Sequence, residues 1–507
     1  MSRVLSSGNL FDAVARTVPL RPDRPALIFN DERHSLDSLL ATADRVAGGL
    51  VAAGLQPGQS VSILSDNRPE QLILYLAMAR AGGLYIPINP KLAPPEIAYI
   101  LDHATPSTVF LSEAMRPLLE TAQAVAAHRP AIRTLDNVGG DSDWHRLASA
   151  APLGASCGGG SDSLAVGYTS ATTGRPKGVE ASHNAQYESA RAFAQLWSLG
   201  PDDCVLNGIT LALFFGLTTS AITNLLAGVP LVLMERFDAQ RALALIEAHR
   251  CTVMPAVPTM LGMLTETARL STRRYDTSSL RLPISSGQRL PAEAAERFRD
   301  TFGVSIYEYF AASECRPIFA WDLSRGDRPQ QGKVGPVGPG VEARILDDTG
   351  APVPVGCEGN LFVRGPTLMT GYYRNPELTR SVLRDGWFET GDRASVDADG
   401  IHTIGSRNKE MINRGAAKVA PPEVETVLLA HPAVREAAVV GVPDPAFGEQ
   451  VKAVLVLKPG SAAGIADIRR HCRERLADFK VPGIVVFVDA LPTGPTGKVL
   501  KRALVDL

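Results

Sequence analysis

The stretch 168–178, YTSATTGRPKG, combines hydroxyl side chains, glycines and one cation, and this combination suits anion binding. Small residues let a backbone approach an anion closely, and hydroxyls and free amides can surround phosphate oxygens. The stretch is not a Walker A loop, because Lys177 is followed by Gly178. The alternative is an ordinary surface loop, in which Ser, Thr and Gly are also common. We predict a phosphate-binding loop with these binding residues: Thr169, Ser170, Thr172, Thr173, Gly174 and Lys177.

Two short apolar runs flank this loop and indicate the elements that hold it. LAVGY (164–168) precedes the loop and VEASH (179–183) follows it, so we predict a strand on each side. A Gly/Ser-rich connector, 151–163, comes directly before the first run. Farther upstream, helix-like and strand-like segments alternate. Helical spacing occurs at 10–18, 36–53 and 70–81, and strand-length runs occur at 61–65 and 85–88. The alternation continues to about residue 260 and is typical of parallel sheets covered by helices.

The last third of the chain differs from the rest in residue composition and in hydrophobic pattern. From about 331 to 405, dense Gly and Pro with short alternating runs predict a β-rich subdomain. After Arg407 a compact α/β piece follows. Its expected helices are 422–429 and 466–476, and its expected strands are 436–442 and 451–457. We therefore expect an α/β protein with doubly wound mixed sheets in an N-terminal domain, 1–407, and a small C-terminal α/β domain, 408–507.

Composition excludes several functional classes. Of 507 residues, 45% are hydrophobic and 21% charged, and the net charge of -2 gives no basic excess for a nucleic-acid partner. The six cysteines contain no C-x-x-C pair, so we expect reduced thiols in a cytoplasmic protein, and the N-terminus lacks a secretion signal. The uncharged segment 209–234 is long enough to cross a membrane. Its hydroxyls and its Gly-Val-Pro break instead predict a buried helix, 217–227, and a strand, 231–234.

The chain resembles the adenylate-forming superfamily of acyl-CoA synthetases, peptide-synthetase adenylation domains and firefly luciferase. The resemblance covers almost the whole chain and rests on motifs in the family's order. These are YTSATTGRPKG (168–178), SSGQRLP (285–291), YFAASE (309–314), GWFETGD (386–392), SRNKEMINRGAAKVAPPEVE (406–425) and PTGPTGK (492–498). It implies two half-reactions in one cleft: a carboxylate attacks the α-phosphate of MgATP to give an acyl-adenylate, and then a thiol, usually CoA, displaces AMP.

The resemblance also implies roles for individual residues. Lys498 would be the adenylation lysine, Glu314 the magnesium ligand and Lys409 the hinge about which a mobile C-terminal domain swings. Out of this context, Lys498 would be a solvated lysine and Glu314 a surface acid. The implied ATP/AMP-binding residues are those of the loop above together with Gly287, Gln288, Arg289, Tyr309, Phe310, Ser313, Asp392 and Arg407. Of these, Asp392 and Arg407 would contact the ribose hydroxyls. Gly415 and Ala416 would lie along the path of CoA.

The family's acyl pocket is lined in part by the segment TLALFFGLTTS (210–220), which carries no charge. Relatives that activate amino acids have an aspartate there, because a buried ammonium without a partner is costly. We therefore expect an acid without an α-amine. The segment's side chains and two small neighbours predict an apolar acid, aryl, fatty or polycyclic. The expected substrate contacts are Leu213, Phe214, Phe215, Gly216, Ala311 and Ala312.

Departures from the family pattern leave several alternatives open. Ala171 stands where glycine is usual, and Arg289 where small residues are common, and both bear on ATP use. An enzyme that only transfers a preformed acyl-adenylate to CoA is therefore an alternative, similar to the ligases of diterpenoid antibiotic biosynthesis such as the platensimycin pathway. Retention of Lys498 favours the complete ligase. An acyl-AMP ligase that loads a carrier protein, a luciferase-like oxygenase and a non-enzymatic nucleotide-binding protein are further alternatives, and a homodimer is left open.

Overall fold

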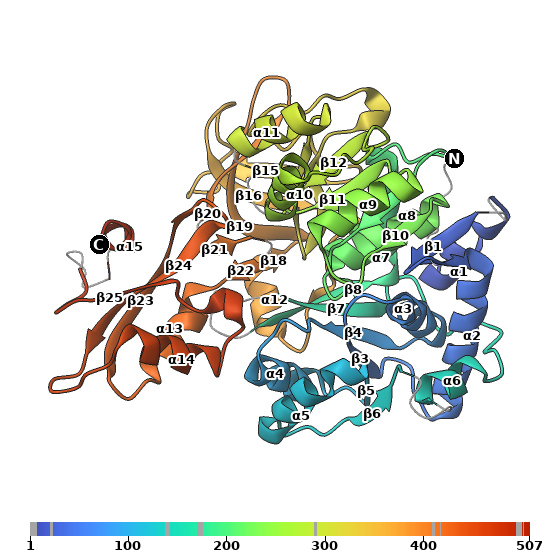
Figure 1. Cartoon of the computed structure of the whole chain (residues 1–507), viewed down its shortest axis with the longest axis horizontal. Coiled ribbons are helices and arrows are strands. Elements are labelled where there is room, and N and C mark those ends of the chain that lie inside the picture. Colours follow the sequence, from blue (N-terminus) through green and yellow to red (C-terminus); the bar gives the residue numbers. More distant parts are fainter. Residues whose placement is uncertain are drawn as a thin grey trace.

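A computed structural model describes residues 8–20, 24–136, 142–169, 176–287, 290, 292–407, 411–415, 417–492, 499 and 501–507 (Figure 1). These residues form four sheets with covering helices. The first sheet has seven strands in the order β17-β8-β7-β4-β3-β5-β6. Its strands are β3 (Ser60–Leu64), β4 (Leu84–Ile88), β5 (Thr108–Leu111), β6 (Ala131–Thr134), β7 (Ser163–Thr169), β8 (Lys177–Ser182) and β17 (Gly371–Tyr372). Strands β3 to β7 run parallel, while β8 and β17 pair antiparallel at one edge.

The second sheet has eight strands in the order β14-β13-β12-β11-β9-β10-β1-β2. Its strands are β1 (Pro25–Phe29), β2 (Glu32–Ser35), β9 (Val205–Asn207), β10 (Leu231–Leu233), β11 (Val253–Ala256), β12 (Leu282–Ser285), β13 (Tyr307–Ala312) and β14 (Cys315–Ala320). The two end strands, β2 and β14, are antiparallel to their neighbours and the others are parallel. The expectation of mixed, mainly parallel sheets is confirmed.

Helices cover both sheets and fill the space between them (Figure 1). They are α1 (Leu10–Ala15), α2 (Leu36–Ala52), α3 (Pro69–Ala81), α4 (Pro94–Ala104), α5 (Arg116–Val125), α6 (Asp143–Ala148), α7 (His183–Leu196), α8 (Thr223–Ala227), α9 (Ala239–His249), α10 (Pro258–Leu270) and α11 (Ala292–Phe302). Every residue of α3 except Glu70 is buried, which explains its apolar sequence. The helix starts at Pro69, where a missing N–H costs nothing, and ends at Gly82 with φ 68°.

Two predicted helices differ in detail from the structure. The helix expected over 10–18 ends at Ala15, and a short 3-10 turn, η1 (Val18–Leu20), follows because Pro19 cannot continue an α-helix. The helix expected over 217–227 begins instead as a π-helix, η3 (Phe215–Ile222), and continues as α8. Such π-helical turns are rare and frequently occur at functional sites. In the part of the chain that the structure describes, no helix has the length and apolarity needed to span a bilayer.

The third and fourth sheets come from the last third of the chain. The third contains β15 (Glu342–Leu346), β16 (Gly359–Arg364), β18 (Leu383–Arg384), β19 (Trp387–Val396) and β20 (His402–Arg407), with α12 (Pro376–Val382) beside it. This is the β-rich region expected from the sequence. The fourth contains β21 (Ile412–Arg414), β22 (Ala417–Val419), β23 (Val434–Asp444), β24 (Gly448–Leu457) and β25 (Ile484–Phe487). Helices α13 (Pro421–Leu429), α14 (Ile465–Arg473) and α15 (Lys501–Val505) complete it, and hydrophobic clusters lie on both of its faces.

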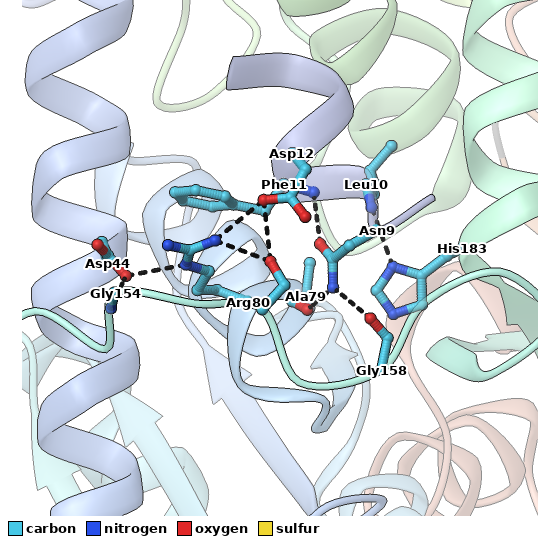
Figure 2. A network of polar contacts seen from close by, with 11 residues as sticks. Asn9, Leu10, Phe11, Asp12, Asp44, Ala79, Arg80, Gly154, Gly158 and His183 are labelled. Atoms are coloured by element: carbon cyan, nitrogen blue, oxygen red, sulfur yellow. Dashed lines mark hydrogen bonds and ion pairs between the residues drawn. The ribbon is translucent and has the colours of Figure 1, made fainter. Parts of the chain in front are cut away.

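A buried polar network fastens the connector before β7 to the first helices (Figure 2). Arg80 forms ion pairs with Asp12 and Asp44, each at 2.9 Å, and donates to Ser156 in the connector. Asn9 donates to the Gly158 carbonyl at 3.1 Å. These contacts fix the path along which the chain enters β7. All six cysteines are free, as the sequence predicts.

Candidate functional site

Strands β7 and β8 hold the two ends of the predicted phosphate loop. They pair antiparallel, and Thr169 lies opposite Lys177 in the register. The prediction that the loop joins two strands is confirmed for these flanks. Thr169 and Lys177 are both half-buried. Ser170, Thr172, Thr173 and Gly174 lie outside the described residues.

A chain of three side chains connects the loop's cation to the predicted magnesium ligand. The Lys177 ammonium lies 5.2 Å from the centre of the Tyr372 ring, a cation–π contact. The Tyr372 hydroxyl donates a hydrogen bond of 2.7 Å to Oε1 of Glu314. Burial and the Glu314 charge raise the pKa of Tyr372, so its hydroxyl stays protonated and able to donate. Strand pairing between β17 and β8 brings Tyr372 into this position.

The contacts of Tyr372 cannot be predicted from the sequence. Tyr372 lies in the run GYY (371–373), inside the region where dense Gly and Pro predict β structure. The sequence signal was weak because a tyrosine in a short strand is usually a packing residue. Only the antiparallel pairing of strands nearly 200 residues apart shows its contact with the site.

The Glu314 carboxylate fits a magnesium ion bound jointly with substrate phosphates. Oε1 accepts from Tyr372, which orients the carboxylate, and Mg²⁺ commonly takes only one or two protein carboxylates in nucleotide sites. Among the described residues, no group of three or more His, Cys, Asp or Glu side chains is arranged to hold a metal by itself. The Glu314 carboxylate offers the oxygen donors that Mg²⁺ prefers.

Two groups of the predicted nucleotide residues lie where parallel strands of the second sheet end. Gly287 follows β12, and Phe310 to Ser313 lie at the end of β13. Ligands of open α/β sheets bind at this edge, outside the carboxyl ends of the strands. Gly287 has φ +92°, a conformation that favours glycine. Gln288 and Arg289 lie outside the described residues.

The two aromatic residues of β13 have different environments. Tyr309 is buried, and its ring packs edge-on against Phe193 and Phe215. Phe310 is half-buried and stacks on Phe319 at 6.1 Å between ring centres. Neighbouring residues of a strand point to opposite faces, so the rings of Tyr309 and Phe310 contact different parts of the molecule. The surroundings of Tyr309 are those of a buried aromatic residue that packs in a hydrophobic core.

The predicted ribose residue, Asp392, lies in β19 in the third sheet. It is buried, and its backbone N–H donates to Thr390 Oγ1 at 3.0 Å. In the register of β19 and β20, Asp392 lies directly opposite Arg407. The two residues predicted to contact ribose therefore occupy one strand pair.

The predicted acyl segment forms the start of η3 and packs against β7. Phe214 is buried, and a Cβ added to Gly167 would lie 2.7 Å from its ring. Leu213 and Phe215 are half-buried, as are Ala311 and Ala312 at the end of β13. A Cβ at Gly216 would lie 2.2 Å from the Thr210 carbonyl oxygen, so close backbone packing explains this glycine.

The fourth sheet faces the rest of the molecule with β21 and β22. Gly415, in the turn between these strands, has φ +61°, and a Cβ there would lie 3.2 Å from Thr259 Oγ1 at the start of α10. Helix α15 lies at the opposite, outer end of this sheet (Figure 1). Lys409, Ala416 and Lys498 lie outside the described residues.

A buried ion triad joins the fourth sheet's region to α4. The Lys480 ammonium donates to Glu96 of α4 and to Glu423 of α13, the latter at 2.8 Å. Lys480 is 2% exposed, and both carboxylates are also buried. Burial raises the pKa of Glu423 to about 7, opposed by Lys480 and reinforced by Glu96. The sequence analysis missed Lys480 because a lone lysine in an apolar run gives no sign of its partners.

Comparison with known proteins places the chain among enzymes with the same architecture. The model for "AMP-binding enzyme" matches residues 14–373, and the model for "AMP-binding enzyme C-terminal domain" matches 423–498. The sulfoacetate–CoA ligase of Cupriavidus necator is 33% identical over 98% of both chains. The feruloyl-CoA synthase of an Amycolatopsis species is 35% identical over 90% of each. The amide bond synthetase McbA of Marinactinospora thermotolerans, 29% identical, superposes with a TM-score of 0.89 over 98% of this chain and 99% of its own.

The motif order and the mixed sheets agree with the family matches over residues 14–373 and 423–498. The narrower resemblance to diterpenoid-antibiotic ligases receives no support from these relatives. The chain belongs to the AMP-binding family of adenylate-forming enzymes.

Proposed function

We propose that the protein is an AMP-forming carboxylic acid–CoA ligase that makes an acyl-CoA from an acid, ATP and CoA through an acyl-adenylate. The observation that carries this proposal is the connection Lys177–Tyr372–Glu314, which brings the phosphate-loop cation and a carboxylate for magnesium to one edge of the sheets. CoA ligases among the relatives support the same reaction.

In the first half-reaction the chain's own residues bind and orient the nucleotide. Lys177 and the loop between β7 and β8 bind phosphates, and Asp392 with Arg407 binds ribose hydroxyls. Glu314, oriented by Tyr372, would hold magnesium, and the ion would supply positive charge next to the phosphates. Lys498 offsets the negative charge that develops as the carboxylate attacks the α-phosphate. Gly287 and Phe310 flank the adenine.

In the second half-reaction the C-terminal domain, 408–507, presents CoA to the acyl-adenylate after turning about Lys409. The turn between β21 and β22 faces the N-terminal domain, 1–407, at Thr259. Helix α15, which follows the lysine-bearing loop in the sequence, lies at the outer end (Figure 1). This arrangement suits the thiol step, with Gly415 and Ala416 along the path of pantetheine. For adenylation, the loop that carries Lys498 would have to face the N-terminal domain in place of the turn between β21 and β22.

The acyl group lies between the start of η3 and the end of β13. Leu213, Phe214 and Phe215 supply an apolar wall, and Ala311 and Ala312 leave room for bulk on the other side. In the part of the segment 210–220 that contacts the acid, no side chain is charged, so the substrate has no α-amine. The body of the acid is therefore aryl or alkyl.

The decisive assay supplies purified enzyme with a panel of acids, once with ATP plus CoA and once with synthetic acyl-adenylate plus CoA. The ligase gives acyl-CoA in both formats and AMP with pyrophosphate in the first. Product from the adenylate alone would establish the thioesterification-only alternative. Faster turnover with holo-carrier protein than with CoA would establish the carrier-loading alternative.

Substitution of the adenylation lysine separates the half-reactions. Lys498→Ala is expected to reduce acyl-adenylate formation by about 100-fold or more, because a preorganised cation at developing charge is lost. The thiol step from synthetic acyl-adenylate should stay within about twofold of wild type. The neighbouring Lys501→Ala, at the start of α15, is the control. An equal loss in both steps would refute the assignment of Lys498.

A further inference from the structure

Arg316 is a buried cation that forms no hydrogen bond or ion pair with an acidic side chain of the described residues. It is the second residue of β14, and its relative exposure is 4%. Within the described residues, its guanidinium donates to two neutral oxygens, the Ser313 carbonyl and Oε1 of Gln186, the latter at 3.2 Å. Glu314, two residues earlier, instead accepts the hydroxyl of Tyr372.

Several polar atoms near this cation can donate a further hydrogen bond. Among the described residues, Nε of Arg316, Nε2 of Gln186 and Oγ of Ser189 are buried and have no hydrogen-bond partner. The orientation of the Gln186 amide is well determined, because Oε1 accepts from both Arg316 and Thr218 Oγ1. Gln186 and Ser189 lie three residues apart on α7 and so share one helix face. Unpaired buried donors are costly, and an acceptor-rich group would remove the cost.

The cation also contacts the predicted acyl segment directly. The Arg316 guanidinium lies 4.2 Å from the centre of the Phe214 ring, and Thr218 of η3 shares the Gln186 oxygen with it. Ser313, whose carbonyl accepts from Arg316, belongs to the YFAASE motif. The unpaired cation is therefore in contact with both segments that line the acyl site, on the side of α7.

We propose that Arg316, with Gln186 and Ser189, binds a second anionic group at the far end of the acid substrate. The substrate class is then a carboxylic acid with an aryl or alkyl body and a distal sulfonate or carboxylate. Three donors and one positive charge match an anion with several acceptor oxygens. The proposal rests on the ligase function. It replaces the apolar acid expected from the sequence with an acid that has an apolar body and a charged group at the end distant from the reacting carboxylate.

The test compares acids that differ only in the charge of the distal group. One pair is 3-(4-sulfophenyl)propanoate and its uncharged sulfamoyl analogue, and the second pair is 6-sulfohexanoate and 6-sulfamoylhexanoate. Only the carboxylate of each acid can be adenylated, so AMP release with CoA reports one productive orientation. The wild-type enzyme should favour the sulfonate by about 10-fold or more in kcat/KM, the factor expected for a charge-assisted hydrogen bond.

Substitutions identify the group responsible for this preference. Arg316→Gln should remove the preference while leaving kcat/KM for the sulfamoyl acids within about threefold, and Arg316→Lys should retain part of it. Arg281→Gln is the matched control. Arg281 forms an ion pair with Asp203, with 2.7 Å between nitrogen and oxygen, and this pair lies away from the acyl site. That variant should lower stability and leave the preference unchanged.

The outcomes separate failure of the inference from failure of the function. Wild-type turnover that favours the sulfamoyl acid in both pairs would overturn the anion site and leave the ligase intact, whether or not Arg316→Gln folds. Equal losses on both members of a pair in Arg316→Gln would show a purely structural role and also overturn it. No AMP release with any acid of a broad panel would instead overturn the proposed function.

Discussion

At the scale of single residues, the site depends on contacts between side chains that are ordinary by themselves. Tyr372 is a strand tyrosine, yet its ring face contacts the Lys177 ammonium and its hydroxyl donates to the Glu314 carboxylate. A hydrogen bond to a charged group contributes about 1.5–3 kcal/mol, enough to fix the orientation of Glu314. The position of that carboxylate is therefore set by a residue outside every motif used to find the site.

Tyr372→Phe is expected to slow adenylate formation by about 10-fold, because Glu314 loses its orienting donor while the ring that meets Lys177 stays. ATP–pyrophosphate exchange at several magnesium concentrations measures this loss. Tyr373→Phe, the adjacent ring, which lies beside His103, is the matched control. The thiol step from synthetic acyl-adenylate should change little, and an equal fall in that step would contradict the assignment.

At the scale of elements, the network of Figure 2 joins α1, α2, α3 and the connector before β7 to the start of α7. The backbone N–H of Leu10 donates to Nδ1 of His183, the first residue of α7. Nδ1 must be unprotonated to accept, so the contact requires a neutral imidazole. Burial lowers the pKa of His183 to about 4, against smaller opposing effects of Asp162 and Asp12.

The stability of the protein should therefore depend on the charge of His183. Since the folded-state pKa lies below the ordinary 6.5, the unfolded chain binds the proton first. The contribution of the neutral His183 imidazole to the free energy of unfolding is fully present above pH 6.5 and is lost as the pH falls toward 4. Between pH 7 and 5 the free energy of unfolding should fall by about 2 kcal/mol from this group.

Urea unfolding of wild type and His183→Asn at both pH values isolates this contribution, because the other titrating groups are common to the two proteins. Asn offers a neutral acceptor near the position of Nδ1. The stability difference between the two proteins should shift by about 2 kcal/mol in favour of the variant at pH 5. A difference independent of pH would show that the imidazole is not held neutral.

At the scale of the whole molecule, the ion triad fixes how the C-terminal region sits on α4. Glu96 accepts from Lys480 and, at 2.9 Å, from the backbone N–H of Ala477, so both acceptor oxygens bind the C-terminal region. The second pair, Lys480 with Glu423, lies entirely within the C-terminal region. Glu96 thus bridges α4 and the C-terminal region, whereas Glu423 stays with Lys480 if the C-terminal region separates from α4.

Glu96→Gln should therefore weaken this arrangement selectively, because a buried pair that loses one charge leaves the other uncompensated. We expect the thiol step from synthetic acyl-adenylate to fall by about 10-fold and adenylate formation to be unchanged or faster. Single-turnover measurements of each half-reaction test this. Glu423→Gln keeps the bridge to α4 and is the control; an identical profile for both variants would remove the bridging role of Glu96.

The sequence predicted the alternation of strands and helices well because burial on both faces leaves a readable pattern. Runs such as 61–65 and 70–81 appear in the structure as β3 and α3 within a residue of the expected ends. It predicted the strands around the phosphate loop for the same reason. It did not predict the π-helix η3, because every residue from Gly216 to Ile222 is buried and the segment has no polar face from which a helical period could be read.

By itself, the sequence determined the fold class, the family and the order of the catalytic motifs, since these depend on local pattern and on residues that are neighbours along the chain. Only the tertiary structure decided which partners Tyr372, Arg316 and Lys480 have. Their contacts with Glu314, Gln186, Glu96 and Glu423 join residues 57 to 384 positions apart, and a side chain's charge balance depends on what is packed around it, which no local pattern records.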